Sequence, residues 1–93
     1  MNTEELLNER DKTHGDFREN ARLAQAFKQI ARTGLNWDKM NDIHREAFDM
    51  VFHKVARALT GDWKENDHYE DLAGYAKLPI KFNHGIQPND PLS

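Results

Sequence analysis

Residues 41–61 read NDIHREAFDMVFHKVARALTG, and this stretch decides the fold. At about 100° per residue in an α-helix, its apolar side chains cover most of the helix circumference. A helix of this kind packs on several neighbours, so we expect it at the centre of an all-α domain. Asn41 or Asp42 should begin the helix, and Gly61 should end it after Thr60.

The preceding helix is marked at both ends. Asp16 is predicted to cap it, and Glu19, three residues later, completes the spacing of a capping box. The helix should continue to about Thr33, where Gly34 follows as a stop signal. Its apolar face contains one amide, Asn20, and a buried amide without a partner costs about 1–3 kcal/mol. We therefore expect Asn20 to bond either to another part of the fold or to a ligand.

Two further helices complete the predicted domain. A short one spans about residues 3–11, and another spans about residues 67–78, because Pro79 prevents much continuation. Residues 1–80 would form a single helical domain, a compact bundle of three main helices plus the short first one. Residues 81–93 contain two prolines and one glycine, and they are predicted to form an irregular tail.

Length, composition and net charge exclude several kinds of protein and site. A chain of 93 residues has a thin core, so we expect it to associate with copies of itself. It has no cysteine, which excludes disulfides and thiolate metal sites and fits a cytoplasmic protein. The net charge of −3 argues against nucleic acid as a partner. No apolar run approaches the ~20 residues of a membrane span.

The central helix has one narrow polar strip, which consists of Glu46, Asp49, His53, Arg57 and Thr60. Its residues lie three or four apart and so share one side of the helix. The strip is either an ordinary solvated face or the lining of a groove between helices. Glu46 and Asp49 are its candidate metal ligands. Lys54 projects into the apolar arc instead, where its stem could pass apolar neighbours or its ammonium could hold a phosphate or carboxylate.

In the last predicted helix, Asp71 and Tyr75 are four residues apart and therefore share a face. Gly74 lies between them and costs about 1 kcal/mol relative to alanine. We expect close helix packing or a ligand at this glycine, and packing is the simpler explanation. No zinc-ligand spacing connects His44, His68 and His84.

Three stretches together resemble a family of small all-α phage and prophage proteins: ERDKTHGDFREN (9–20), NWDKMNDIHREAFDMVFHKVARALTGD (36–62) and YEDLAGYAKL (69–78). The family pattern is R-x-K-T-H/Y-G-D-F-x-x-N, then K-x-x-R before G-D, then D-x-A-G-Y-A. The resemblance implies an accessory protein of unassigned function in the cytoplasm of a bacterial host. It also implies a set of ligand-binding residues, namely Lys12, His14, Asp16, Asn20, Lys54, Arg57, Asp71 and Tyr75.

A looser resemblance is to the all-α nucleotide pyrophosphohydrolases of the MazG and dimeric dUTPase type. These enzymes bind Mg²⁺ through acidic pairs, E-x-x-E and E-x-x-D, on consecutive helices. Glu46 and Asp49 match one pair, but Glu70 is followed three residues later by Ala73, so the second pair is broken. The resemblance implies Mg²⁺ for such a hydrolase. Outside that alternative we expect no cofactor.

The residues and the two resemblances leave three candidate functions. We favour a non-enzymatic module that binds a host or defence protein or a nucleotide-like ligand. The alternatives are the Mg²⁺-dependent pyrophosphohydrolase and a DNA-binding regulator, which the acidic charge disfavours. In the ligand version, the three cations of the family pattern would hold phosphates, while a base would stack on His14 or Tyr75 and hydrogen-bond to Asn20. We expect residues 10–20 to meet the third and fourth helices at this polar site.

Overall fold

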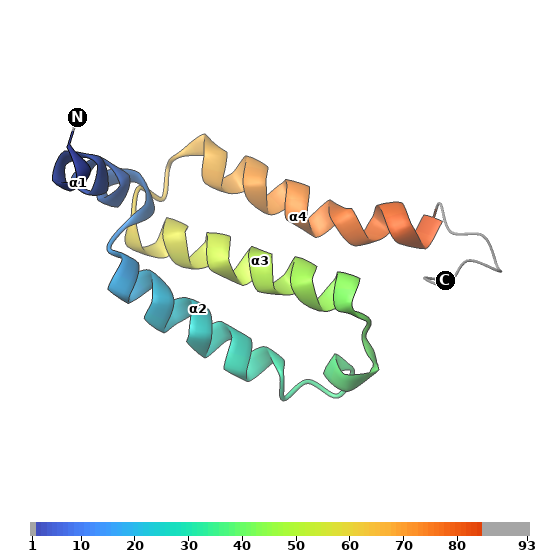
Figure 1. Cartoon of the computed structure of the whole chain (residues 1–93). Helices are drawn as coiled ribbons and strands as arrows, with labels where there is room; N and C mark the ends of the chain where they lie inside the picture. The colour runs from blue at the N-terminus through green and yellow to red at the C-terminus, as the bar shows by residue number, and fades with distance from the viewer. Residues whose placement is uncertain (1, 85–93) are drawn as a thin grey trace.

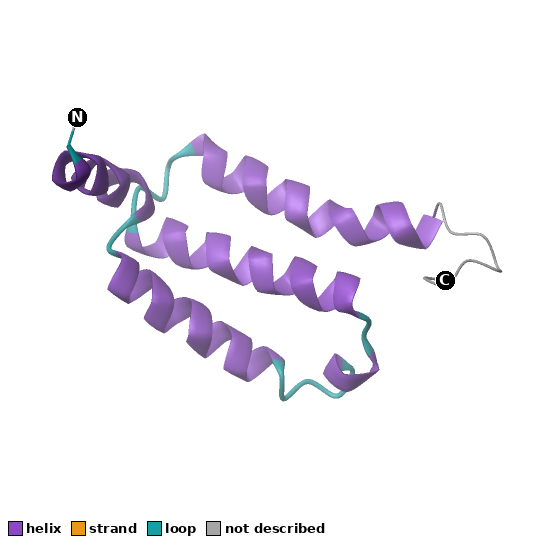
Figure 2. Cartoon of the chain, viewed as in Figure 1, coloured by secondary structure: helices purple, strands orange, loops and turns teal. Residues whose placement is uncertain are grey.

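The computed structural model describes residues 2–84, except for the side chains of residues 9–12 and 84. It contains four α-helices and one 3₁₀ turn: α1 (Thr3–His14), α2 (Phe17–Ala31), η1 (Trp37–Lys39), α3 (Asp42–Thr60) and α4 (Asn66–His84). No strand occurs among the described residues (Figure 2). The predicted all-α class, with three long helices and a shorter one before them, is confirmed.

Helix α3 lies at the centre of the molecule, as its apolar circumference predicts. α2 and α4 pack along two sides of it, and the chain runs up, down and up through the three helices (Figure 1). α1 lies across one end of this layer, where it contacts α3. The layer has a long axis, because the molecule measures 51 × 27 × 24 Å.

The predicted ends of α3 are confirmed. The side chain of Asn41 accepts a hydrogen bond from the His44 N–H at 3.0 Å, which caps the first turn. At the other end, the Gly61 N–H still bonds to the carbonyl of Arg57, and the helix ends at Thr60.

The other helix ends differ from prediction. α1 continues to His14, three residues beyond the predicted end at Asp11. α2 ends at Ala31 rather than near residue 33, because the N–H groups of Thr33 and Gly34 bond to carbonyls only three residues back. Such bonds tighten the chain into a 3₁₀-type turn and so end the α-helix.

The predicted end of α4 at residue 78 is wrong, because α4 continues through Pro79 to His84. A proline inside a helix removes one hydrogen bond and costs about 3 kcal/mol. Packing offsets this cost here: Phe82 lies half-buried against the first turns of α3, and Asn83 lies 3.4 Å from the ring of His44. Residues 81–84, predicted to begin an irregular tail, are therefore helical. Residues 85–93 lie outside the described part, so the rest of the irregular tail stays a prediction.

Small side chains form the core of the layer. The buried apolar residues are Ala24, Ala47, Ala56 and Ala58. Buried polar residues, Asn20 and His68, lie beside them. The large apolar side chains are half-buried or exposed on the faces of the layer. Within the described residues, no helix combines the length and hydropathy that crossing a bilayer requires.

Candidate functional site

The turn between α1 and α2 lies against the start of α4 and the end of α3. The carbonyl oxygen of Thr13 accepts two hydrogen bonds, from the N–H of Asp62 and from Nε2 of His68, each at 2.9 Å. Because a carbonyl can only accept, Nε2 of His68 carries the proton. As predicted, residues 10–20 meet the third and fourth helices.

Two glycines allow this close approach. Gly15 has φ +78, a left-handed conformation that favours glycine, and a Cβ added there would lie 2.5 Å from the carbonyl carbon of Thr60. A Cβ added at Gly61 would lie 2.6 Å from the carbonyl carbon of Thr13. The two backbones therefore touch where any larger residue would separate them.

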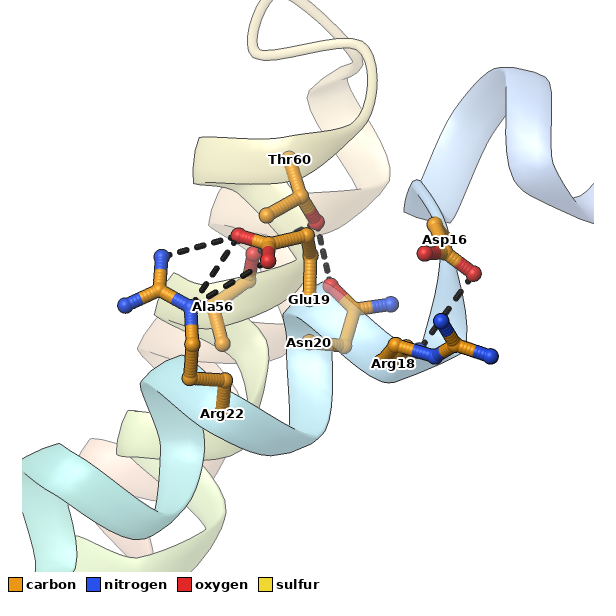
Figure 3. A network of polar contacts seen from close by, with 7 residues as sticks. All are labelled: Asp16, Arg18, Glu19, Asn20, Arg22, Ala56 and Thr60. Carbon is orange, nitrogen blue, oxygen red and sulfur yellow. Dashed lines mark hydrogen bonds and ion pairs between the residues drawn. The ribbon is translucent and has the colours of Figure 1, made fainter.

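Asn20 connects α2 to this junction (Figure 3). Its Nδ2 donates to the carbonyl of His14 at 2.7 Å, and its Oδ1 accepts from the hydroxyl of Thr60. The residue is only 5% exposed. Of the two alternatives left open by the sequence, the internal hydrogen bond is therefore present. Asn20 shapes the site rather than projecting a free amide into it.

Asp16 caps α2, but the predicted capping box does not form. The Asp16 carboxylate accepts from the Arg18 N–H at 3.3 Å, whereas Glu19 forms an ion pair with Arg22 at 2.8 Å (Figure 3). That ion pair holds the pKa of the Glu19 carboxyl below its usual range, with the hydrogen bond as the larger cause. A basic side chain one turn along competes successfully for the carboxylate that would complete the box.

A pocket of about 250 Å³ lies beside the junction and has a mixed lining. Its residues come from α1, the α1–α2 turn, α2 and α3: Leu7, His14, Gly15, Phe17, Asn20, His53 and Arg57. Phe17 is 75% exposed at the rim. The ring of His14 packs edge-on against the buried ring of His68, with centroids 5.5 Å apart.

The charged groups that act on His53 in the wall of this pocket are all cations. The pKa of His53 is lowered, chiefly by its burial and further by the positive charges of Arg57, Lys28 and Lys54. Arg57 forms no ion pair with any described carboxylate. Among the described residues, the wall formed by α3 therefore carries a guanidinium without a paired carboxylate, a group whose donors fit the oxygens of an anion.

Lys54 and Asp71 connect α3 to α4 next to the pocket. Nζ of Lys54 lies 2.9 Å from the Asp71 carboxylate, and the Lys54 side chain is largely buried. The hydrogen bond from Lys54 is the main cause that lowers the pKa of Asp71, and its charge adds to the effect. Lys54 is thus held by a carboxylate. The structure shows this internal ion pair, whereas the functional role left open by the sequence, a cation for the phosphate or carboxylate of a ligand, stays a prediction.

Tyr75 and Gly74 line a separate hollow on α4, and Asp71 lines it as well. Tyr75 also borders a groove of about 380 Å³ together with Glu46 and Met50. No atom lies within 4 Å of a Cβ added at Gly74, so the helix packing expected at this glycine is absent.

The structure does not bring the candidate metal ligands Glu46 and Asp49 together with a third ligand. Asp49 accepts from Arg32, the residue after α2, at 3.3 Å, whereas Glu46 lines the groove against α4. Among the described residues, no group of three or more His, Cys, Asp or Glu side chains could hold a metal ion. Lys12 belongs to the predicted ligand set, but its side chain lies outside the described part of the chain.

His68 is the residue that sequence reasoning missed. Its spacing in the sequence relates only to zinc sites, yet its side chain is 1% exposed and bonds the α1–α2 turn to α4. A signal for its burial was present, because His68 precedes Leu72, Tyr75 and Pro79 at helical spacing on the stripe that faces α3.

Comparison with protein families gives one identification. Residues 2–83 match the family described as "Domain of unknown function (DUF6378)", so the chain belongs to that family. No curated protein and no solved structure matches the chain.

Proposed function

We propose that this member of the family is a binding module for a small ligand that carries several phosphate groups, such as a nucleotide. The observation that carries the proposal is the position of Arg57, which lines a pocket without a described carboxylate partner. Arginine in such a place offers a planar fork of donors that fits phosphate oxygens. Lys28 and Lys54 lie near enough to affect the charge state of His53 in the same wall.

The rim of the pocket suits a flat organic group. Phe17 exposes most of its ring there, and His14 lines the same pocket. A nucleobase stacked on an aromatic ring gains about 1–3 kcal/mol, as in other nucleic-acid sites. In this proposal Arg57 and Lys28 hold phosphate, Phe17 or His14 stacks on the base, and Asn20 positions the pocket wall. Tyr75 lies in the neighbouring hollow, outside this pocket.

Titration calorimetry with inorganic triphosphate and ATP tests the proposal. We expect saturable binding of one ligand per chain, and Arg57→Ala should weaken it at least about tenfold, a loss of ~1.4 kcal/mol. Lys77→Ala is the matched control, because it removes one positive charge from an exposed position of α4 that lines none of these pockets. Equal weakening by both variants would show only a non-specific charge effect. Absence of binding to both ligands would refute the proposal.

The Mg²⁺-dependent hydrolase has less support from the geometry. Two of the carboxylates it would use already form ion pairs within the chain: Asp49 pairs with Arg32, and Asp71 pairs with Lys54. The DNA-binding alternative would use the arginines Arg18, Arg22 and Arg32, and two of these, Arg22 and Arg32, form ion pairs with carboxylates. Release of pyrophosphate from a nucleoside triphosphate with Mg²⁺ or Mn²⁺ would reverse this preference.

The resemblance to small phage and prophage proteins supports an accessory role for the module. A protein without a catalytic set can act by sequestering a nucleotide-like signal or by presenting it to a host or defence protein. If the calorimetric experiment gives no binding, a pull-down from bacterial lysate is the next measurement, and a specific host protein would then replace the nucleotide as the proposed ligand.

A further inference from the structure

The two faces of the helical layer differ in chemistry. At about 100° per residue, Phe48, Val55 and Leu59 lie on one side of α3, and Glu46, His53 and Arg57 lie on the opposite side. The second side carries the pocket described above. We call the first side, together with what adjoins it from α2 and the following loop, the apolar face; it consists of Ile30, Leu35, Phe48, Phe52, Val55 and Leu59.

Two grooves run along the apolar face, and Phe48 lines both. Their volumes are about 390 and 250 Å³. Neither lining contains an Asp, Glu, Lys or Arg side chain. Three pockets on the other side of the layer are each lined by at least one of these residue types. The grooves of the apolar face are therefore uncharged, whereas Arg32 and Arg45 lie beside one of them, against the ring of Trp37.

The apolar face is open to solvent in the single chain. Ile30 is 69% exposed, Leu59 is 61% exposed and Phe48 is 46% exposed. The ring of Phe52 packs against two other rings: its centroid lies 6.1 Å from that of Phe27 and 6.4 Å from that of Phe48. A contiguous apolar surface of this kind marks an interaction site in a soluble protein.

We propose that the apolar face binds the same face of a second copy of this chain in a two-fold symmetric dimer. The first argument is the core of the single chain. Its buried apolar side chains, among the described residues, are four alanines. Burying large side chains gives about 1.5–3 kcal/mol each, whereas alanine gives far less, so the chain needs a second layer to complete its core.

The second argument is the size of the face. A helix of 19 residues is about 28 Å long at 1.5 Å per residue, and two helices at 8–10 Å spacing span about 18 Å. The footprint is therefore roughly 500 Å² on each copy, or about 1,000 Å² in total, which reaches the ~1,000 Å² that a biological interface requires. Grooves whose linings carry no formal charge can also meet the same grooves of a second copy without electrostatic repulsion, which a two-fold interface requires.

The third argument concerns which partner is available. A chain that cannot complete its own core folds only when a partner is present, and another copy is present wherever the chain is made. A different protein would have to accompany every molecule. The observations therefore favour a second copy over an unrelated partner.

Sedimentation velocity and thermal unfolding of the full chain, over a roughly hundredfold range of concentration, test the dimer. We expect a dimer whose melting temperature rises with concentration. Ile30→Glu should weaken association at least about tenfold. Leu78→Glu is the matched control, because Leu78 is 46% exposed on the opposite side of the layer, and this variant should remain dimeric. A monomer at every concentration, or equal loss in both variants, would overturn the proposal.

A second measurement covers the case in which Ile30→Glu does not fold. The chain has no cysteine, so single thiols can be introduced by Leu59→Cys and by Leu78→Cys. In the isolated chain position 59 is the more exposed, 61% against 46%. If a second copy covers the apolar face, the thiol at position 59 should be alkylated at least about tenfold more slowly. Faster alkylation at position 59 would overturn the proposal independently of any folding defect. The result does not depend on the phosphate-ligand proposal.

Discussion

Three glycines of this chain have different physical roles, and their surroundings decide what an alanine would do. Gly15 and Gly61 lie where the backbones of the α1–α2 turn and the end of α3 touch. Gly74 lies on the open surface of α4, with nothing within 4 Å of an added Cβ. The first two are needed for packing, whereas Gly74 only weakens its helix.

Alanine at these positions should therefore have opposite effects. Gly61→Ala should lower the free energy of unfolding by roughly 1–3 kcal/mol, because its Cβ would overlap the Thr13 carbonyl. Gly74→Ala should raise that free energy by up to about 1 kcal/mol through helix propensity. Urea unfolding followed by circular dichroism measures both. A loss of stability in Gly74→Ala would mean that a partner chain or another segment approaches α4 closely.

In the proposed ligand site, we expect His53 to make binding depend on pH. Its pKa lies below the ordinary value of 6.5, because burial and the charges of Arg57, Lys28 and Lys54 disfavour the imidazolium. In the free protein, the unfolded chain therefore takes up this proton first as the pH falls. The contribution of neutral His53 to stability is fully present above pH 6.5 and is lost as the pH falls through the lowered pKa.

A bound phosphate reverses this preference, because an anion stabilises the imidazolium. We expect affinity for inorganic triphosphate to rise as the pH falls from about 8 to about 6. His53→Gln should flatten this dependence while keeping a polar group of similar size. Because triphosphate itself titrates in this range, the difference in slope between the two proteins is the quantity to measure by calorimetry. Identical slopes would exclude His53 from the binding site.

At the scale of helices, the sequence predicts which residues share a face but not what each one meets. The periodicity of α3 correctly places Asp49, His53 and Thr60 on one side. Their partners come from distant segments: Asp49 pairs with Arg32, and Thr60 bonds to Asn20, forty residues earlier. No local rule fixes such pairings, because they depend on how α2 is set against α3.

The errors in helix length have a similar cause. Capping residues are local, and they predict both ends of α3 correctly, with Asn41 and Gly61 as the caps. α4 passes Pro79 because Phe82 and Asn83 contact the first turns of α3, and such tertiary contacts outweigh a local breaker. His68 was missed for the same reason, since its only recognisable local role was that of a metal ligand.

At the scale of the whole molecule, the two proposals assign ligand binding to one side of the layer and association to the other. The polar side holds the pocket around Arg57, and the apolar side provides the proposed contact between copies. The side chains in between, which are mainly alanines, are small enough for the helices to lie close together. In a chain of 93 residues, a single layer of helices has little buried interior. One side of the layer can therefore be apolar and exposed while the other carries a polar pocket.

This division predicts that binding and association are independent. In a dimer formed through the apolar face, the two pockets lie on the outer surfaces, so neither is covered and each chain binds one ligand. Ile30→Glu should therefore keep its affinity for inorganic triphosphate within about twofold while losing the dimer, and Arg57→Ala should show the reverse. Calorimetry and sedimentation on the same preparations measure both properties. If a folded, monomeric Ile30→Glu variant also lost triphosphate binding, the pocket would need the second copy, and the two sides of the layer would be coupled rather than separate.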